Sequence, residues 1–321
     1  MAPEPNPLAH GVDETADRLD RRPWPATPLR PGLEVSFEFF PPATPAGERS
    51  LERTVAELAP LHPRFASVTY GAGGSTQERT IATVEQLVGA GVRTGAHLTC
   101  VGKSRDQVDE VVDRYLATGV EHIVALRGDP PEGTDDGRHP DGYRDAAELV
   151  AGIRRRSDVD ISVAAYPEVH PRATSAAADM DNLKRKIDAG ATQAITQFFF
   201  DADVFLRFFE RARAAGITVP IVPGIMPITH FAKVSGFAER CGADVPRWLR
   251  ELFDGLDDAP EVRDLVAATV AAEQCRRLAE HGIRSFHFYT MNKSALTASV
   301  CRILGVRPHA RAQLAGAAAA V

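Results

Sequence analysis

Two carboxylates lie in sequence surroundings that suit acid–base chemistry. Glu38 lies among phenylalanines in residues 35–42 (VSFEFFPP), and Asp129 closely follows the apolar run 123–126. Burial among apolar side chains disfavours the charged form of a carboxyl group, so we expect the pKa of Glu38 to be raised. A carboxyl group with a raised pKa can act as a general acid near neutral pH. The alternative is a strand-end carboxylate that pairs with Arg127 or with a lysine.

Arg127 stands two residues before Asp129, so both side chains can face the same side of the fold. In a functional interpretation, Arg127 neutralises an anion and Asp129 places a charge beside a cofactor ring. The alternative is a simple Arg–Asp pair that closes the fold.

Three further polar residues follow apolar strand patterns. Tyr166 and His170 stand in YPEVH, where the phenol ring could stack on a planar ligand and the imidazole could contact a phosphate. Gln197 stands in TQFFF, and its amide could pair with the donors and acceptors of a heterocycle. Each of these residues could equally have a structural role.

A charged stripe follows on the next helical pattern. Asp179, Asn182 and Lys186 are spaced i, i+3 and i+7, so they share one helix face, with Arg185 beside them. This face is either solvated or a contact surface for a pyrophosphate and a ribityl chain.

Strand and helix patterns alternate along most of the chain. This alternation predicts a parallel sheet with helical crossovers, and eight strands fit a single-domain (β/α)8 TIM barrel. The expected strands are 33–39, 65–70, 94–100, 121–127, 160–166, 192–199, 219–225 and 284–289. The expected helices are 47–59, 76–90, 104–118, 145–156, 179–189, 202–215, 229–240, 260–281 and 293–304.

The rival architecture is an open doubly wound sheet, but no G-x-G-x-x-G follows the first strand. The glycine run 71–76 comes after the second strand, and it fits either an anion loop or a plain turn. Residue parity favours the barrel, because one parity class of most strands is polar or small. We assign to this inner face the following residues: Ser36, Glu38, Ser67, Thr69, Gly95, His97, Thr99, Ala125, Arg127, Asp129, Ser162, Ala164, Tyr166, Gln193, Gln197, Ser285, His287 and Tyr289.

Composition and charge exclude several classes of protein. The chain has 321 residues and a net charge of −6, which does not suit nucleic-acid binding. It has no apolar run long enough for a membrane span, and the four separated cysteines are typical of a reduced, cytoplasmic protein. The histidines form no metal-ligand motif. We expect a flexible Pro-rich arm over 1–32, a catalytic barrel over 33–306 and a disordered Ala-rich tail over 307–321.

Many ordered motifs together resemble methylenetetrahydrofolate reductase of the short bacterial type. They are VSFEFFPP (35–42), SVTYG (67–71), HLTC (97–100), HIVALRGD (122–129), AYPEVH (165–170), AITQFFFD (194–201), PGIMP (223–227) and FHFYT (286–290). The resemblance implies a barrel that holds FAD at its C-terminal mouth. It also implies reduction of 5,10-methylenetetrahydrofolate to 5-methyltetrahydrofolate, which supplies methyl groups for methionine synthesis. NAD(P)H is the implied hydride donor, the order is ping-pong, and the enzyme is expected to be a homo-oligomer.

The resemblance also implies roles for single residues. Glu38 matches the catalytic acid, and Asp129 matches a carboxylate beside the flavin that also meets folate. Gln197 matches a folate contact. The residues that match flavin contacts are Thr69, His97, Arg127, Gly128, Asp129, Ala146, Tyr166, His170, Asp179, Asn182, Arg185 and Lys186.

Three positions depart from the family pattern. Asp145 stands where the family usually has an aromatic residue or histidine, and the lost ring would loosen the FAD. Lys233 falls where a bacterial relative has glutamine, and Lys293 replaces an expected arginine in the folate site. Lysine keeps the charge but lacks the bidentate fork, so the glutamate tail of folate would be held differently. A flavin-free reductase and a binding module without catalysis remain as alternatives.

Overall fold

The computed structural model describes residues 32–70, 74–130 and 137–308. Almost all of the predicted N-terminal arm and C-terminal tail lies outside the described residues, as do three residues of the glycine run. No helix in the described part is long and apolar enough to cross a membrane.

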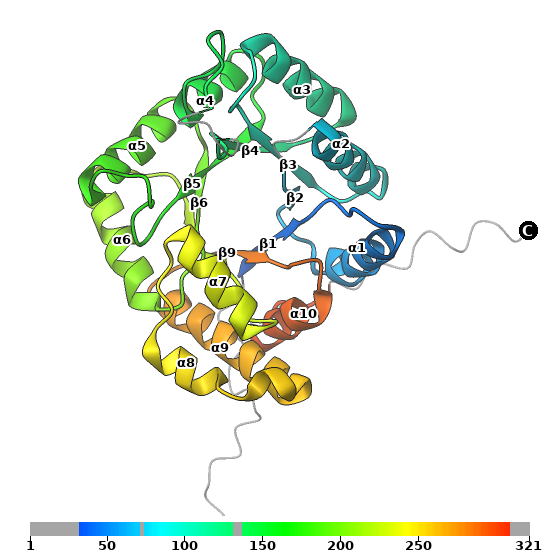
Figure 1. The fold of residues 1–321 in the computed structure, drawn as a ribbon, viewed down its shortest axis with the longest axis vertical. Coiled ribbons are helices and arrows are strands. Elements are labelled where there is room, and N and C mark those ends of the chain that lie inside the picture. The colour runs from blue at the N-terminus through cyan, green and yellow to red at the C-terminus, as the bar shows by residue number, and fades with distance from the viewer. Residues whose placement is uncertain (1–31, 71–73, 131–136, 309–321) are drawn as a thin grey trace, which may run out of the picture.

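In the described part of the chain, nine parallel strands form the central sheet, in the order β7-β6-β5-β4-β3-β2-β1-β9-β8. Figure 1 shows them as a ring surrounded by helices, which confirms the predicted (β/α)8 barrel. The strands are β1 (Glu34–Phe39), β2 (Ala66–Val68), β3 (Thr94–Thr99), β4 (His122–Leu126), β5 (Asp160–Ala165), β6 (Gln193–Thr196), β7 (Ile221–Val222), β8 (Gly224–Ile225) and β9 (Ser285–Tyr289).

The ring closes at a divided segment around Pro223. The predicted strand 219–225 is two short strands, because proline has no N–H to donate to a ladder. β7 pairs with β6, and β8 pairs with β9. The Pro223 carbonyl accepts from the His287 amide at 3.0 Å, and the Gly224 amide donates to Thr196 Oγ1 at 3.0 Å. One short segment therefore bonds to both of its neighbours.

The helices confirm the predicted alternation and add one element. All nine predicted helices are present, and the additional helix is α8, whose seven residues were not predicted. The helices are α1 (Pro45–Leu58), α2 (Gly74–Gly89), α3 (Arg105–Thr118), α4 (Ala146–Arg154), α5 (Ala176–Asp188), α6 (Ala202–Ala214), α7 (Phe231–Cys241), α8 (Arg247–Phe253), α9 (Pro260–Glu280) and α10 (Ser294–Ile303). Short 3₁₀ turns lie at η2 (Ala59–Leu61) and η3 (Leu256–Asp258).

The inner-face prediction is confirmed for several strands and wrong for β4. Strand register places Ser36 beside His287, and Glu38 beside Ser67 and Tyr289. In β4, however, the residues that align with the inner faces of β3 and β5 are His122, Val124 and Leu126. The prediction took the polarity of Arg127 and Asp129 as its guide. The strand ends at Leu126, and Gly128 has φ +86°, so the alternation does not extend to these residues.

Two apolar clusters follow from this arrangement. The large cluster lies between the sheet and the helices and includes Ile123 and Ala125 from the outer face of β4. The small cluster fills the barrel interior with Phe65, Val124, Ile195 and Val222. Phe65 also stacks on the buried His122 at 4.0 Å, so side chains occupy the interior at this level, which leaves the strand ends as the place for a polar ligand.

Candidate active site

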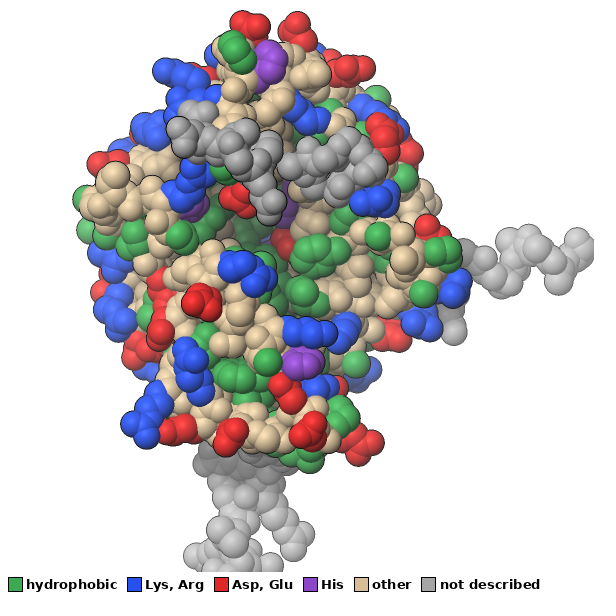
Figure 2. Space-filling view, in the orientation of Figure 1, with side chains coloured by type: hydrophobic (Ala, Val, Ile, Leu, Met, Phe, Trp, Pro, Cys, Tyr) green, Lys and Arg blue, Asp and Glu red, His purple; other side chains and the backbone are tan. Residues whose placement is uncertain are grey.

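A cavity of about 490 Å³ opens at the C-terminal ends of β4 and β5. Ten of the twelve residues predicted to contact a cofactor line it: Arg127, Gly128, Asp129, Ala146, Tyr166, His170, Asp179, Asn182, Arg185 and Lys186. They come from two strand ends, α4, α5 and the loops between them. Parallel barrels keep their ligands at this end, and Figure 2 shows the face hollowed at its centre, with acidic and histidine side chains in the hollow.

The loop after β4 is shaped by close packing against the end of β3. The Arg127 carbonyl accepts from the Cys100 and Val101 amides at 3.2 and 2.9 Å. A Cβ on Gly128 would lie 2.7 Å from Val101 Cγ1, and its φ of +86° also favours glycine. Arg127 and Asp129, which both lie in the described part of the chain, do not form an ion pair with each other. The alternative in which a simple Arg–Asp pair closes the fold is therefore wrong.

Helix α5 brings a buried ammonium group to the cavity. Its N-cap is Ser175, whose Oγ accepts from the Ala178 amide at 3.1 Å, so the helix begins earlier than predicted. Lys186 is 6% exposed, and its Nζ donates to the Ala164 carbonyl at 2.5 Å. Burial lowers the pKa of Lys186 to about 8. An ammonium group has three donors, so this charge retains capacity for an anionic ligand.

Asp179 and His170 are linked at the cavity wall. Asp179 Oδ2 accepts from the His170 amide at 2.9 Å, and the His170 ring meets the Tyr166 ring edge to face at 4.4 Å. Val169, which lies between Tyr166 and His170 in the sequence, has φ +84°, a strained conformation for a β-branched residue. Strain of this kind concentrates where a loop is held for binding.

Glu38 lies on the inner face of the barrel between two imidazoles. Its Oε2 is 3.3 Å from His97 Nε2 on β3 and 3.7 Å from His287 Nε2 on β9. His287 Nδ1 is 2.8 Å from Ser36 Oγ, which fixes that ring. Histidines, rather than Arg127 or a lysine, are therefore the partners of Glu38, and the predicted alternative of an ion pair with those residues is wrong.

Burial keeps the His97 imidazole in its neutral form. Desolvation lowers the pKa of His97, although Glu38 opposes the shift and His287 adds to it. His97 is therefore neutral near pH 7, and its Nε2 also lies 3.3 Å from Ser67 Oγ. A neutral imidazole beside a carboxyl group can donate or accept a hydrogen bond and so orient that group for acid–base chemistry.

The remaining predicted site residues do not line the cavity. His97 faces Glu38, and Thr69 follows β2 with its amide bonded to the Phe39 carbonyl at 2.9 Å. Gln197 follows β6, where its Oε1 accepts from the Phe198 amide at 3.0 Å. Lys233 on α7 and Lys293 at the start of α10 are exposed at the surface.

Sequence reasoning missed some of the residues at this end of the barrel. Arg138, Arg144 and Arg172 also line the cavity, although their loop positions carried no signal. His287 was assigned to the inner face but given no role, because its contact with Glu38 depends on register between β1 and β9. Among the described residues, no His, Cys, Asp and Glu side chains gather as a metal site.

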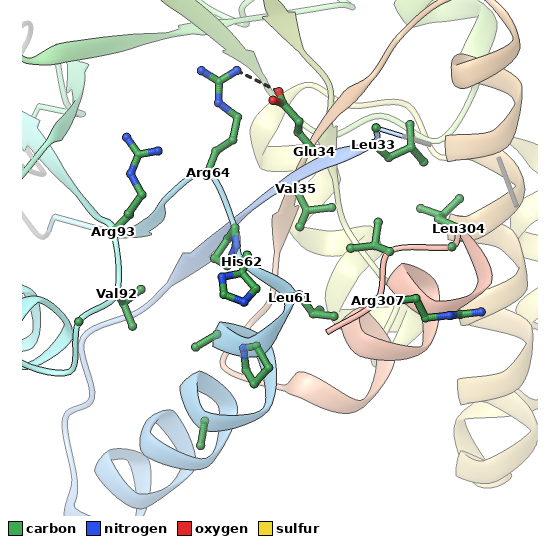
Figure 3. Close-up of a pocket in the computed structure, with 18 of the residues that line it drawn as sticks. Leu33, Glu34, Val35, Leu61, His62, Arg64, Val92, Arg93, Leu304 and Arg307 are labelled. Atoms are coloured by element: carbon green, nitrogen blue, oxygen red, sulfur yellow. Dashed lines mark hydrogen bonds and ion pairs between the residues drawn. The ribbon is translucent and has the colours of Figure 1, made fainter. Parts of the chain in front are cut away.

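A second, larger cavity of about 1060 Å³ lies at the opposite end of the barrel. It is bordered by the start of β1, the turns before β2 and β3, and the segment after α10 (Figure 3). Leu33, Val35, Leu61 and Leu304 line it, and Arg64 pairs with Glu34 at 3.0 Å on its rim. This is the N-terminal face, which serves stability rather than chemistry in such barrels, so the smaller cavity is the candidate active site.

Comparison with known proteins identifies closely similar chains. A family model described as methylenetetrahydrofolate reductase matches residues 30–305. A 5,10-methylenetetrahydrofolate reductase of Pectobacterium carotovorum is 48% identical over 283 residues, covering 87% of this chain and 93% of the relative. The enzyme of that name from Escherichia coli is 45% identical over 277 residues, covering 86% of this chain and 92% of its own.

A solved structure has the same fold at low sequence identity. It is an uncharacterized protein from Clostridium thermocellum that binds two copies of 5-methyl-5,6,7,8-tetrahydrofolic acid. The TM-score is 0.60 at 14% identity, covering 85% of this chain and 94% of that one. At this identity the likeness concerns the fold alone.

Proposed function

This chain belongs to the methylenetetrahydrofolate reductase family and is an oxidoreductase with that activity, and we propose that it works through bound FAD. The proposed reaction reduces 5,10-methylenetetrahydrofolate to 5-methyltetrahydrofolate in ping-pong order, with NAD(P)H as the hydride donor. The observation that carries the proposal is the gathering of ten predicted cofactor contacts around one cavity at the barrel mouth.

The residues around the cavity fit a flavin dinucleotide. Arg127, Arg185 and Lys186 supply the positive charge that a diphosphate needs, and Lys186 is a buried cation with donor capacity left. Asp179 and Asn182 supply acceptors and donors for ribityl hydroxyl groups. Gly128 lets the loop after β4 pack directly against Val101 and Thr99, which places its backbone at the cavity. When bound, FAD supplies hydride transfer, which no protein side chain can perform.

In the proposed mechanism, Glu38 provides the proton. Its carboxyl group lies inside the mouth, buried to 7% exposure, where an incoming pterin can displace water from it. Protonation of a substrate nitrogen by Glu38 would open the methylene bridge to a reactive iminium. His97 and His287 flank the carboxyl group at 3.3 and 3.7 Å and would position it toward the substrate. Asp129 would place a negative charge beside both the cofactor ring and the folate.

Folate binding extends the proposal to residues around the mouth. Gln197, at the end of β6, would pair with the pterin. Lys233 and Lys293 are exposed cations on the elements that follow β8 and β9, where a glutamate tail would leave the barrel. A methyl-supply role in methionine synthesis and a homo-oligomeric assembly belong to the same proposal and are supported by the motif resemblance. A cytoplasmic location is supported by the four separated cysteines.

The role of Glu38 is tested by Glu38→Gln, with the exposed Glu57→Gln as the matched control. We expect reduction of methylenetetrahydrofolate to fall by about 10²- to 10⁴-fold, because a positioned acid contributes that much. Flavin content and the rate of flavin reduction by NAD(P)H should stay near those of the wild type. Unchanged folate turnover in a flavin-loaded Glu38→Gln enzyme would show that another group is the acid.

A further inference from the structure

Asp145 and Arg185 form an ion pair on the wall of the mouth cavity. Asp145 Oδ2 lies 2.9 Å from Arg185 Nη1, and Arg185 Nη2 donates to Asn182 Oδ1 at 2.8 Å. All three side chains line the cavity. Both terminal nitrogens of the guanidinium group are thus already engaged by groups of this chain.

Helix α4 holds Asp145 in place. The Oδ1 atom of Asp145 accepts from the Ala147 and Glu148 amides, each at 3.0 Å, which leaves Oδ2 for Arg185. Burial acts to raise the pKa of Asp145, but the Glu148 amide and the Arg185 guanidinium outweigh it and lower that pKa. Asp145 is therefore a fixed negative charge at neutral pH.

The negative charge of Asp145 lies among side chains that are mostly positively charged. The other charged groups along this part of the cavity are mostly cations, including Arg127, Arg144 and the buried Lys186. An arginine fork is the preferred protein ligand for a phosphate group. A carboxylate bound to that fork competes with an incoming phosphate for the same donors and also repels it.

We propose that Asp145 acts as an internal competitor for the anionic part of the cofactor and sets how tightly this enzyme holds it. The carboxylate occupies Arg185 before binding, and a diphosphate must share or displace it. This inference rests on the proposed function insofar as the cofactor is FAD. Asp145 is thus an affinity-determining residue that acts through Arg185.

The test compares Asp145→Asn with the wild type. Asparagine is a good helix N-cap, so α4 should remain intact while the charge is lost. FAD-saturated full-length protein is diluted, and the dissociation constant and release rate are read from the fluorescence of released flavin. We expect about fivefold tighter binding, the ratio that corresponds to about 1 kcal/mol for a partly exposed charge pair. Riboflavin, which has no phosphate, should bind both proteins equally.

Two further variants test whether Asp145 acts through Arg185. Asp188→Asn removes a paired carboxylate at the end of α5, which lies 3.0 Å from Lys184 Nζ and does not line the cavity, so FAD affinity should be unchanged. In an Arg185→Gln background, the gain from Asp145→Asn should largely disappear. The inference would be overturned if Asp188→Asn tightened FAD binding as much as Asp145→Asn does. It would also be overturned if Asp145→Asn tightened FAD binding equally in the Arg185→Gln background, or tightened riboflavin binding to the same degree.

The outcomes also separate this inference from the proposed function. If the wild type binds FAD and Asp145→Asn binds it no more tightly, the competitor role fails while the flavin enzyme stands. If neither protein binds FAD at any concentration, both the inference and the FAD part of the proposed function fail.

Discussion

Lys186 is the residue whose environment most strongly indicates a bound ligand. Its ammonium group is almost completely buried, and the Ala164 carbonyl accepts from it. Burying an ammonium group costs free energy unless hydrogen bonds and opposite charge offset the lost hydration. The folded pKa of about 8 lies below the usual value of 10.5, so Lys186 is charged at pH 7 and loses that charge as the pH rises through about 8.

The affinity for FAD should therefore decline as the pH is raised from 7 to 9, because the neutral amine no longer attracts a diphosphate. Lys186→Met should weaken binding at pH 7 by about 10- to 100-fold, since hydrogen bonds to charged groups contribute about 1.5–3 kcal/mol. The variant should also lose most of the pH dependence. Flavin fluorescence titrations at several pH values measure both effects.

The matched control is Lys184→Met, which removes an exposed lysine that pairs with Asp188 on the same helix. It should bind FAD as the wild type does at every pH. A wild-type affinity that stays constant from pH 7 to 9 would show that Lys186 does not contact the anion.

At the level of elements, periodicity was sufficient to place every strand and nine of the helices. It could not place contacts that depend on how strands align. The contact between His97 and Glu38 depends on how β1 and β3 align, and the sequence did not predict it. The inner face of β4 was misassigned because Gly128 ends the alternation before Asp129. The division at Pro223 follows from its missing N–H, which the apolar pattern over 219–225 does not reveal, and the seven residues of α8 are too few for a helical period to be recognised.

Gly224 lies at the seam of the barrel, the place where β8 pairs with β9 and closes the ring, and it has no room for a side chain. A Cβ on this residue would lie 2.2 Å from the Thr196 carbonyl oxygen and 2.6 Å from Tyr289 Cε2. Gly224→Ala should therefore lower the free energy of unfolding by about 2 kcal/mol or more, because backbone must move to relieve the overlap. Urea denaturation measures the loss.

Gly89→Ala provides the comparison for this experiment. Gly89 ends α2, and a Cβ there would meet nothing within 4 Å. Alanine favours helix over glycine by about 1 kcal/mol, so this variant should be as stable as the wild type or more so. Equal stability of the two variants would mean that the seam tolerates an added side chain.

On the scale of the whole molecule, the barrel separates stability from chemistry. Phe65, Val124, Ile195 and Val222 pack in the interior together with buried polar side chains such as His122, so among the described residues the cavities lie at the strand ends. The residues predicted to contact a cofactor gather on the side of β4 and β5, and Glu38 with its two histidines lies on β1, β3 and β9. The proposed cofactor cavity and the proposed proton donor thus lie at one mouth, as a reaction between a bound cofactor and a second molecule would require.

The absorption spectrum of the full-length protein shows whether this family member performs its reduction through bound FAD. The protein, as isolated or after reconstitution, should show the visible band of oxidised flavin. Anaerobic NADH or NADPH should bleach that band, and methylenetetrahydrofolate should then restore it with formation of 5-methyltetrahydrofolate. A protein that cannot be loaded with FAD, yet still reduces methylenetetrahydrofolate, would contradict the account.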